Sequence, residues 1–148
     1  YPPGSDVIGV DISRPMLDRA RQRRHRLDID CDLVEMDVLH LAFPDRSFDG
    51  IVATFLFCVL EPSAQGPALS ELARVCRPGG EVRILEYAYS ANPWARMIMR
   101  LWAPWVRFAY GAAFDRDTES HIGDAGFDLV ERRFLFRDII KLLVLRPS

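Results

Sequence analysis

The chain has 148 residues, of which 49 % are apolar and 27 % are charged, the balance of one globular domain with a hydrophobic core. Its net charge of -2 argues against a nucleic-acid-binding protein. The widely spaced cysteines, Cys31, Cys58 and Cys76, form no CxxC pair and no Cys/His spacing, which argues against a zinc site or a disulfide framework. We expect a reduced, cytoplasmic protein with no metal site.

The first half of the chain predicts alternating strands and helices. An apolar run at residues 7–10 ends at Asp11, and Ser13 with Pro15 is typical of a helix start. Further strands are predicted over residues 32–36, 49–55 and 81–87, with a helix around residues 68–76 and a break at residues 77–80. Crossovers of this length indicate parallel pairing and an α/β sheet with helices on both faces.

The second half has a different character. Residues 92–114 are aromatic and apolar with scattered arginines, and residues 115–124 predict a short helix ended by Gly126. Residues 127–136 and 139–145 predict an antiparallel hairpin, because only a short turn separates them. We therefore predict an α/β, Rossmann-like, doubly wound and mostly parallel sheet that ends in an antiparallel hairpin, in a single domain over residues 1–148.

Ligands of open α/β sheets bind beyond the carboxyl ends of the strands. Asp11 ends the first strand, where a carboxylate can accept hydrogen bonds from the hydroxyls of a ribose. Asp37, with Val38, ends the second strand, and Thr54 with Phe55 ends the third. Either acid taken alone is more often a turn or cap residue, and it is their joint pattern that predicts a binding site.

Three motifs in order resemble class I S-adenosylmethionine-dependent methyltransferases. They are Gly9-Val10-Asp11-Ile12-Ser13 with Met16-Leu17, then Asp37 with Phe43-Pro44-Asp45 and Ser47-Phe48-Asp49, then Glu71-Leu72 with Arg77-Pro78-Gly79-Gly80. The resemblance implies S-adenosylmethionine as cofactor. It implies that Asp11 binds the ribose, that Ile12, Met16, Asp37 and Val38 contact the adenine, and that Thr54 and Phe55 line the methionine side. Quinone-biosynthesis C-methyltransferases, bacterial phospholipid N-methyltransferases and membrane-associated thiol methyltransferases are the most similar groups.

The sequence departs from this family before Asp11. The family's first strand and its glycine-rich loop do not precede the strand at residues 7–10. We therefore expect the domain to be N-terminally incomplete in this chain. Two alternatives stay open: a non-catalytic fragment or pseudo-enzyme that acts as a binding partner, and an NAD-dependent oxidoreductase, since an acid after a second strand also marks that fold.

Methyl transfer from a sulfonium needs alignment and exclusion of water, and it needs a general base only when the nucleophile arrives protonated. Strand geometry makes Glu86 and Tyr87 the predicted catalytic residues.

The segment 92–114 predicts the substrate class. The residues we expect to contact substrate or membrane are Trp94, Arg96, Arg100, Trp102, Trp105, Tyr110 and His121. An aromatic body with a basic stripe is typical of an interfacial helix, although a cap that buries its aromatic residues on the rim of the site is an equal alternative. We expect methyl transfer to a small hydrophobic or lipid-like acceptor: a phospholipid amine, a quinone precursor or a thiol. Peripheral membrane contact is a further hypothesis, and no pattern predicts an oligomeric state.

Overall fold

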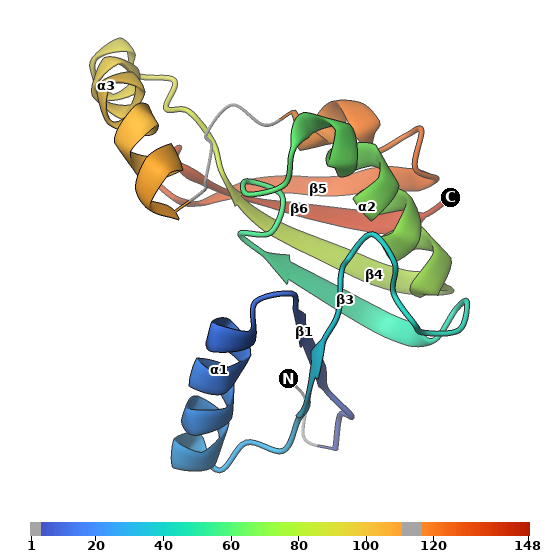
Figure 1. Ribbon diagram of the computed structural model, residues 1–148. Helices are drawn as coiled ribbons and strands as arrows, with labels where there is room; N and C mark the ends of the chain where they lie inside the picture. Colours follow the sequence, from blue (N-terminus) through green and yellow to red (C-terminus); the bar gives the residue numbers. More distant parts are fainter. Residues whose placement is uncertain (1–3, 111–116) are drawn as a thin grey trace. The chain divides into compact units, whose positions relative to one another are not determined.

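A computed structural model describes residues 4–110 and 117–148 of the chain. It divides into two compact units, Tyr1–Ala42 and Phe43–Ser148, which are described here one at a time (Figure 1). The strands and helices in chain order are β1 (Ile8–Asp11), α1 (Arg14–Leu27), β2 (Asp32–Glu35), β3 (Phe48–Thr54), α2 (Pro62–Val75), β4 (Cys76–Tyr87), α3 (Pro93–Tyr110), η1 (Thr118–His121), β5 (Phe127–Phe136) and β6 (Ile140–Pro147).

The first unit is a β–α–β arrangement. Strands β1 and β2 pair in parallel, with Ile8 opposite Asp32 and Asp11 opposite Glu35. Helix α1 connects them and buries Leu17, which is 2 % exposed. The helix ends where Asp28 adopts a positive φ of 51° and donates its backbone N–H to a carbonyl of the last turn. The carboxyl end of β1 is thereby placed directly before the start of α1.

The second unit contains a sheet of strand order β3-β4-β6-β5. Strands β3 and β4 are parallel, whereas β6 pairs antiparallel with both β4 and β5. Helix α2 and the 3-10 helix η1 contact each other, and α2 also packs on β4 (Figure 1). The predicted α/β fold, with parallel strands and an antiparallel end, is confirmed.

The sequence predicted that residues 77–80 form a break between a helix and a strand. In the structure these residues lie within strand β4. Strand β4 begins at Cys76, opposite Phe48, and the turn forms an irregularity inside the strand before Glu81 pairs with Gly50. Gly79 has a φ of +82°. A Cβ on Gly80 would lie 2.8 Å from Cys76 Sγ and 2.9 Å from the Asp49 carbonyl oxygen. Both positions therefore need glycine, one for its backbone angle and one for space.

The core of the second unit lies between α2, η1 and the sheet. Its largest buried apolar side chains, all under 2 % exposed, are Phe57, Phe127, Leu69, Val75, Val82, Ile84, Leu143 and Leu145. Strand β4 alternates regularly, so that Val82, Ile84 and Glu86 are buried together on one face. A carboxylate thus occupies a position that the alternation assigns to the core.

The aromatic segment forms α3, which includes Pro104 without ending there. Residues 111–114, the end of the predicted 92–114 cap, lie outside the described residues. The short helix predicted over 115–124 is the 3-10 helix η1 at Thr118–His121, and residues 115 and 116 again lie outside the described part. No helix in residues 4–110 or 117–148 is long and apolar enough to cross a bilayer.

Candidate functional site

Asp11 ends β1 and is half-buried. Its Oδ1 accepts the backbone N–H of Ser13 at 2.8 Å, which fixes the carboxylate at the entry to α1. Its Oδ2 has no donor among the residues that the structure describes. A carboxylate with one oxygen anchored and one available can accept hydrogen bonds from vicinal hydroxyls, so the Asp11 side chain fits a ribose.

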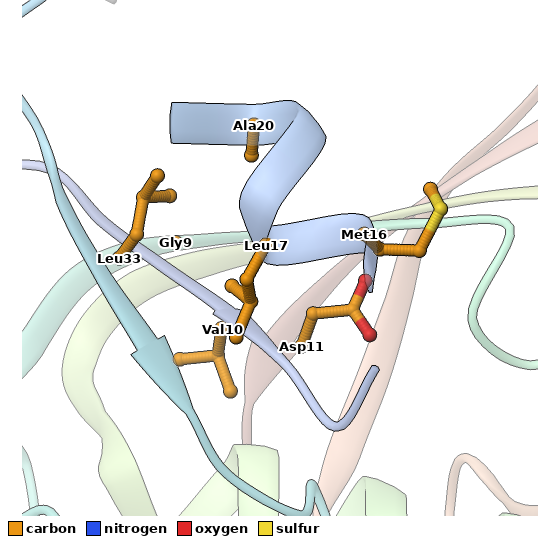
Figure 2. Close-up of a pocket in the computed structure, with 7 residues that line it drawn as sticks. All are labelled: Gly9, Val10, Asp11, Met16, Leu17, Ala20 and Leu33. Carbon is orange, nitrogen blue, oxygen red and sulfur yellow. The ribbon is translucent and has the colours of Figure 1, made fainter. Parts of the chain in front are cut away.

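A cavity of about 210 Å³ adjoins Asp11. Its lining residues are Gly9, Val10, Asp11, Met16, Leu17, Ala20 and Leu33. Figure 2 shows the Asp11 carboxylate beside Met16 at the start of α1. Ile12 and Met16 are both largely exposed, so each offers apolar surface next to the carboxylate. Apolar walls around one oriented polar group are typical of a nucleoside site.

Asp37 follows β2, and its carboxylate, like that of Asp11, accepts the backbone N–H of the residue two positions later. Its Oδ1 accepts the backbone N–H of Leu39 at 2.9 Å, and its carbonyl accepts the N–H of His40. Val38 beside it is half-buried. The turn explains the local geometry of Asp37 without a ligand, and contact of Asp37 or Val38 with an adenine stays a prediction.

The structure brings two of the predicted residues of the second unit together at the carboxyl ends of β3 and β4. The rings of Phe55 and Tyr87 stack with centroids 4.5 Å apart and an interplanar angle of 21°. Phe55 has a positive φ of 53°, an uncommon angle for a bulky residue, and its N–H binds the Leu85 carbonyl at 2.7 Å. Thr54 precedes it and is exposed. The stacked pair forms a small aromatic surface at this edge of the sheet.

Glu86, predicted as catalytic, is 1 % exposed and belongs to a buried polar cluster. The Thr118 hydroxyl lies 2.8 Å from Glu86 Oε2 and 2.9 Å from the amide oxygen of Gln65. Lys141 Nζ lies 3.0 Å from Glu86 Oε1, an ion pair by distance that lacks hydrogen-bond geometry. Because both oxygens face protein groups, the cluster ties η1, α2 and the sheet together. A catalytic role for Glu86 stays a prediction.

Lys141 is the cation of this cluster. Burial alone would lower the pKa of its ammonium, but a hydrogen bond to Glu119 at 2.7 Å and the nearby Glu86 carboxylate outweigh that effect and raise the pKa. The ammonium is therefore held in its charged form between two carboxylates.

The predicted substrate and membrane residues are distributed over two elements. Trp94, Trp102 and Trp105 are exposed on α3, and the Trp102 and Trp105 rings meet edge to face with centroids 6.0 Å apart. Arg96 Nε donates to the Ser90 carbonyl at 2.8 Å, and Arg100 is exposed. The side chain of Tyr110 lies outside the described residues.

His121 ends η1 on the other element. It is half-buried beside Gly66 of α2, where a Cβ on that glycine would lie 3.6 Å from His121 Nδ1. The imidazole is therefore part of the packing between η1 and α2, and contact of His121 with substrate stays a prediction.

Sequence reasoning missed Thr118 and Lys141, the partners of Glu86, and Gln65, which contacts Thr118 in the same cluster. One signal was available, because Lys141 is the only lysine and interrupts an apolar strand. A charged residue in a buried strand needs an opposite charge. Gln65 and Thr118 carry no such signal, since both are common on surfaces.

Comparison with known proteins identifies the class. The family model described as "Methyltransferase domain" matches residues 1–80, more than half of the chain. The chain therefore belongs to this methyltransferase family, which confirms the resemblance drawn from its motifs. Membership implies S-adenosylmethionine as the cofactor, and it argues against the NAD-dependent oxidoreductase alternative.

Two curated relatives are each similar over somewhat more than half of the chain. A phosphatidylethanolamine N-methyltransferase of Cereibacter sphaeroides is 44 % identical over 84 residues, covering 55 % of this chain and 40 % of the relative. A demethylmenaquinone methyltransferase of Thermus thermophilus is 38 % identical over 85 residues, covering 57 % and 38 % respectively. The chain thus spans about two fifths of the length of these relatives.

A solved structure extends the likeness to the second half of the fold. A SAM-dependent methyltransferase of Methanosarcina mazei is 17 % identical, with a TM-score of 0.76 over 97 % of this chain and 82 % of that protein. Agreement at this identity establishes the fold and leaves the substrate to other arguments.

Proposed function

We propose that the protein transfers a methyl group from S-adenosylmethionine to a small hydrophobic or lipid-like acceptor. The observation that carries the proposal is Asp11: a half-buried carboxylate at the end of β1, inside the matched family region, with Oδ2 available. The sulfonium of the cofactor is already activated toward displacement, so the protein has mainly to bind, orient and exclude water.

The proposed roles follow the local chemistry of each residue. Asp11 accepts hydrogen bonds from the ribose hydroxyls, and Ile12 with Met16 provides apolar contact beside it. Phe55 and Tyr87 offer an aromatic surface that suits an apolar acceptor better than a sugar. The Tyr87 hydroxyl oxygen is the candidate to accept a hydrogen bond from an acceptor that arrives protonated and so to orient it, while the proton that the acceptor loses passes to solvent.

Two observations support the proposed acceptor class: the exposed apolar surface of the protein and the names of its relatives. The names of the two relatives specify phosphatidylethanolamine and demethylmenaquinone, both of which carry long hydrocarbon chains. The exposed aromatic side chains of α3 fit an acceptor of this kind. Phosphatidylethanolamine and demethylmenaquinone are therefore the first two acceptors to test, with a hydrophobic thiol as the third.

Cofactor binding is tested by calorimetric titration of S-adenosylhomocysteine into the protein expressed in its full reading frame. Asp11→Ala should weaken binding about 100-fold or more, because it removes up to two hydrogen bonds to a charged acceptor. Asp11→Asn keeps an oxygen that can accept the Ser13 N–H, and it should weaken binding less than Asp11→Ala does. Asp18→Ala, at an exposed acid paired with Arg21, is the matched control and should bind normally. Undiminished binding by a folded Asp11→Ala protein would refute the assigned role.

Activity is tested by transfer of a labelled methyl group to each of the three acceptors. Incorporation into one of them, lost in Asp11→Ala, is the expected result. Binding of S-adenosylhomocysteine without transfer to any of them would remove the proposed acceptor class. Absence of both would favour a non-catalytic binding protein.

A further inference from the structure

Helix α3 exposes an apolar face that spans its length. The exposed large apolar side chains on this helix are Trp94, Met97, Ile98, Leu101, Trp102, Trp105 and Phe108. Their spacing of three and four residues places them within an arc of about 140° on a helix of 3.6 residues per turn. Trp94 and Leu101 are each 73 % exposed and Phe108 is 91 % exposed. We refer to these residues as the apolar face of α3.

The remaining surface of α3 comprises a half-buried side and a charged side. Ala95, Met99, Ala103 and Val106 are half-buried and lie next to the apolar face around the helix. The charged residues of the helix are all arginines. Arg96 and Arg100 are spaced four residues apart, which places them along one side. The helix contains no aspartate or glutamate. An apolar face, with a purely cationic stripe on the polar side, is the composition of helices that lie in a membrane interface.

From this arrangement we infer that α3 is a membrane-docking helix, whose apolar face inserts into the surface of a bilayer that contains anionic phospholipids. Tryptophan favours the level of the headgroups, and all three tryptophans of the chain belong to this face. The arginine stripe complements anionic headgroups. The helix therefore lies along the surface rather than across the bilayer. This inference rests on α3 alone and holds whether or not the proposed methyl transfer does.

Charge also distinguishes a bilayer from a second copy of the chain. Pairing the apolar face of α3 with that of a second copy would leave the arginine stripes of both helices on the outer sides of the pair, and α3 offers them no aspartate or glutamate as a partner. An anionic headgroup layer supplies the opposite charge that a second copy of α3 lacks.

The base of α3 is held to the sheet, so that insertion can orient the second unit. The Asp138 carboxylate, in the turn between β5 and β6, accepts the Ser90 hydroxyl at 2.7 Å and the Ala91 N–H at 2.6 Å. Asn92 then caps the helix by accepting the N–H of Trp94. Phe136, the last residue of β5, is exposed next to this turn, with the Arg137 guanidinium 5.8 Å from its ring centroid. The hairpin end that anchors the base of α3 thus also presents an aromatic ring and a cation.

Because all three tryptophans of these 148 residues belong to α3, the tryptophan fluorescence of this chain reports on the helix directly. The probe is vesicles of phosphatidylcholine alone, or with about one third phosphatidylglycerol, whose negative charge provides the electrostatic attraction. On the mixed vesicles the emission should shift to shorter wavelength, and phospholipids brominated near the headgroup end of their acyl chains should quench it. An unchanged spectrum with no co-flotation of protein would refute the inference.

Substitutions separate the apolar and electrostatic contributions. Leu101→Ser should lower the partition coefficient about tenfold, the loss expected for one inserted leucine. Leu27→Ser, at an exposed leucine that ends α1, is the matched control and should partition normally. Arg100→Gln should lower the partition coefficient about fivefold on the mixed vesicles and little on phosphatidylcholine vesicles. Arg23→Gln in α1 is its control and should leave the partition coefficient unchanged on both.

The outcomes also separate this inference from the proposed function. Calorimetric binding of S-adenosylhomocysteine should be the same in Leu101→Ser as in the native protein. Equal partitioning of Leu101→Ser and the native protein would overturn docking by α3. A lipid-independent blue shift that grows with protein concentration would instead assign the apolar face to a second copy of the chain.

Discussion

Asp11 and Glu86 each occupy the carboxyl end of a parallel strand, one in each compact unit, and their surroundings differ. Asp11 is half-buried and has one oxygen anchored by a backbone N–H. Glu86 is fully buried and has both oxygens facing protein groups, Thr118 on one side and Lys141 on the other. Position at a strand end therefore identifies two candidate functional carboxylates. Their partners distinguish Asp11, which is open to a ligand, from Glu86, which is engaged by the fold.

The substitution with the largest expected effect on stability is Glu86→Ala, which tests this contrast directly. It removes a buried partner of Lys141 and leaves a cavity, so the free energy of unfolding should fall by about 3–5 kcal/mol. The measurement is denaturant unfolding. Glu81→Ala, which breaks an exposed pair with Arg83 on the same strand, should cost less than about 1 kcal/mol. The double change Glu86→Leu with Lys141→Met should recover most of the loss, and no recovery would mean that the pair is not the reason for it.

Alkaline pH tests the same cluster from its cationic side. The folded pKa of Lys141 is raised above 10.5, so its contribution to stability is complete below that pH and is lost as pH rises through the folded pKa. The difference in unfolding free energy between the native protein and Lys141→Met should therefore stay constant from pH 7 to about pH 10 and shrink only above it. A difference that declines below pH 9 would contradict the raised pKa.

The smallest expected effect is that of Asp11 on stability. Asp11→Ala removes one local hydrogen bond to Ser13 and should lower the free energy of unfolding by about 1 kcal/mol. Asp11→Asn should cost less, because its amide oxygen can replace Oδ1. A loss as large as that of Glu86→Ala would show that Asp11, too, is engaged mainly by the fold.

Much of the fold could be predicted because its signals are local. Apolar runs that end at Asp11 and Thr54 mark β1 and β3, and the short gap between the last two apolar runs marks the hairpin β5–β6. The position of Asp11 beside a helix start was predictable in the same way. The buried cluster around Glu86 was not, because Gln65, Thr118 and Lys141 lie between 21 and 55 residues from Glu86 in the sequence and meet only through tertiary packing.

Two local details also escaped prediction for physical reasons. The Arg77–Gly80 turn reads as a chain break, yet the flanking residues on both sides pair with β3, so tertiary pairing overrides the turn signal. The apolar periodicity of α3 predicts a helix but does not say whether its apolar side faces the protein or the solvent. In the structure that side is exposed, which favours the interfacial interpretation over a buried rim.

The Arg77–Gly80 turn also acts as a spacer that sets the phase of β4. Between two paired positions, β3 advances from Phe48 to Gly50 while β4 advances from Cys76 to Glu81, and the turn absorbs the difference. The alternation after it keeps Glu86 inside and puts Tyr87 on the opposite side of the strand, next to Phe55. A strand shifted by one residue exchanges its two faces. Deleting one residue of the turn, with Cys76 kept in register, would therefore place Tyr87 opposite Lys141 in place of Glu86, and would turn the carboxylate toward the face of Phe55.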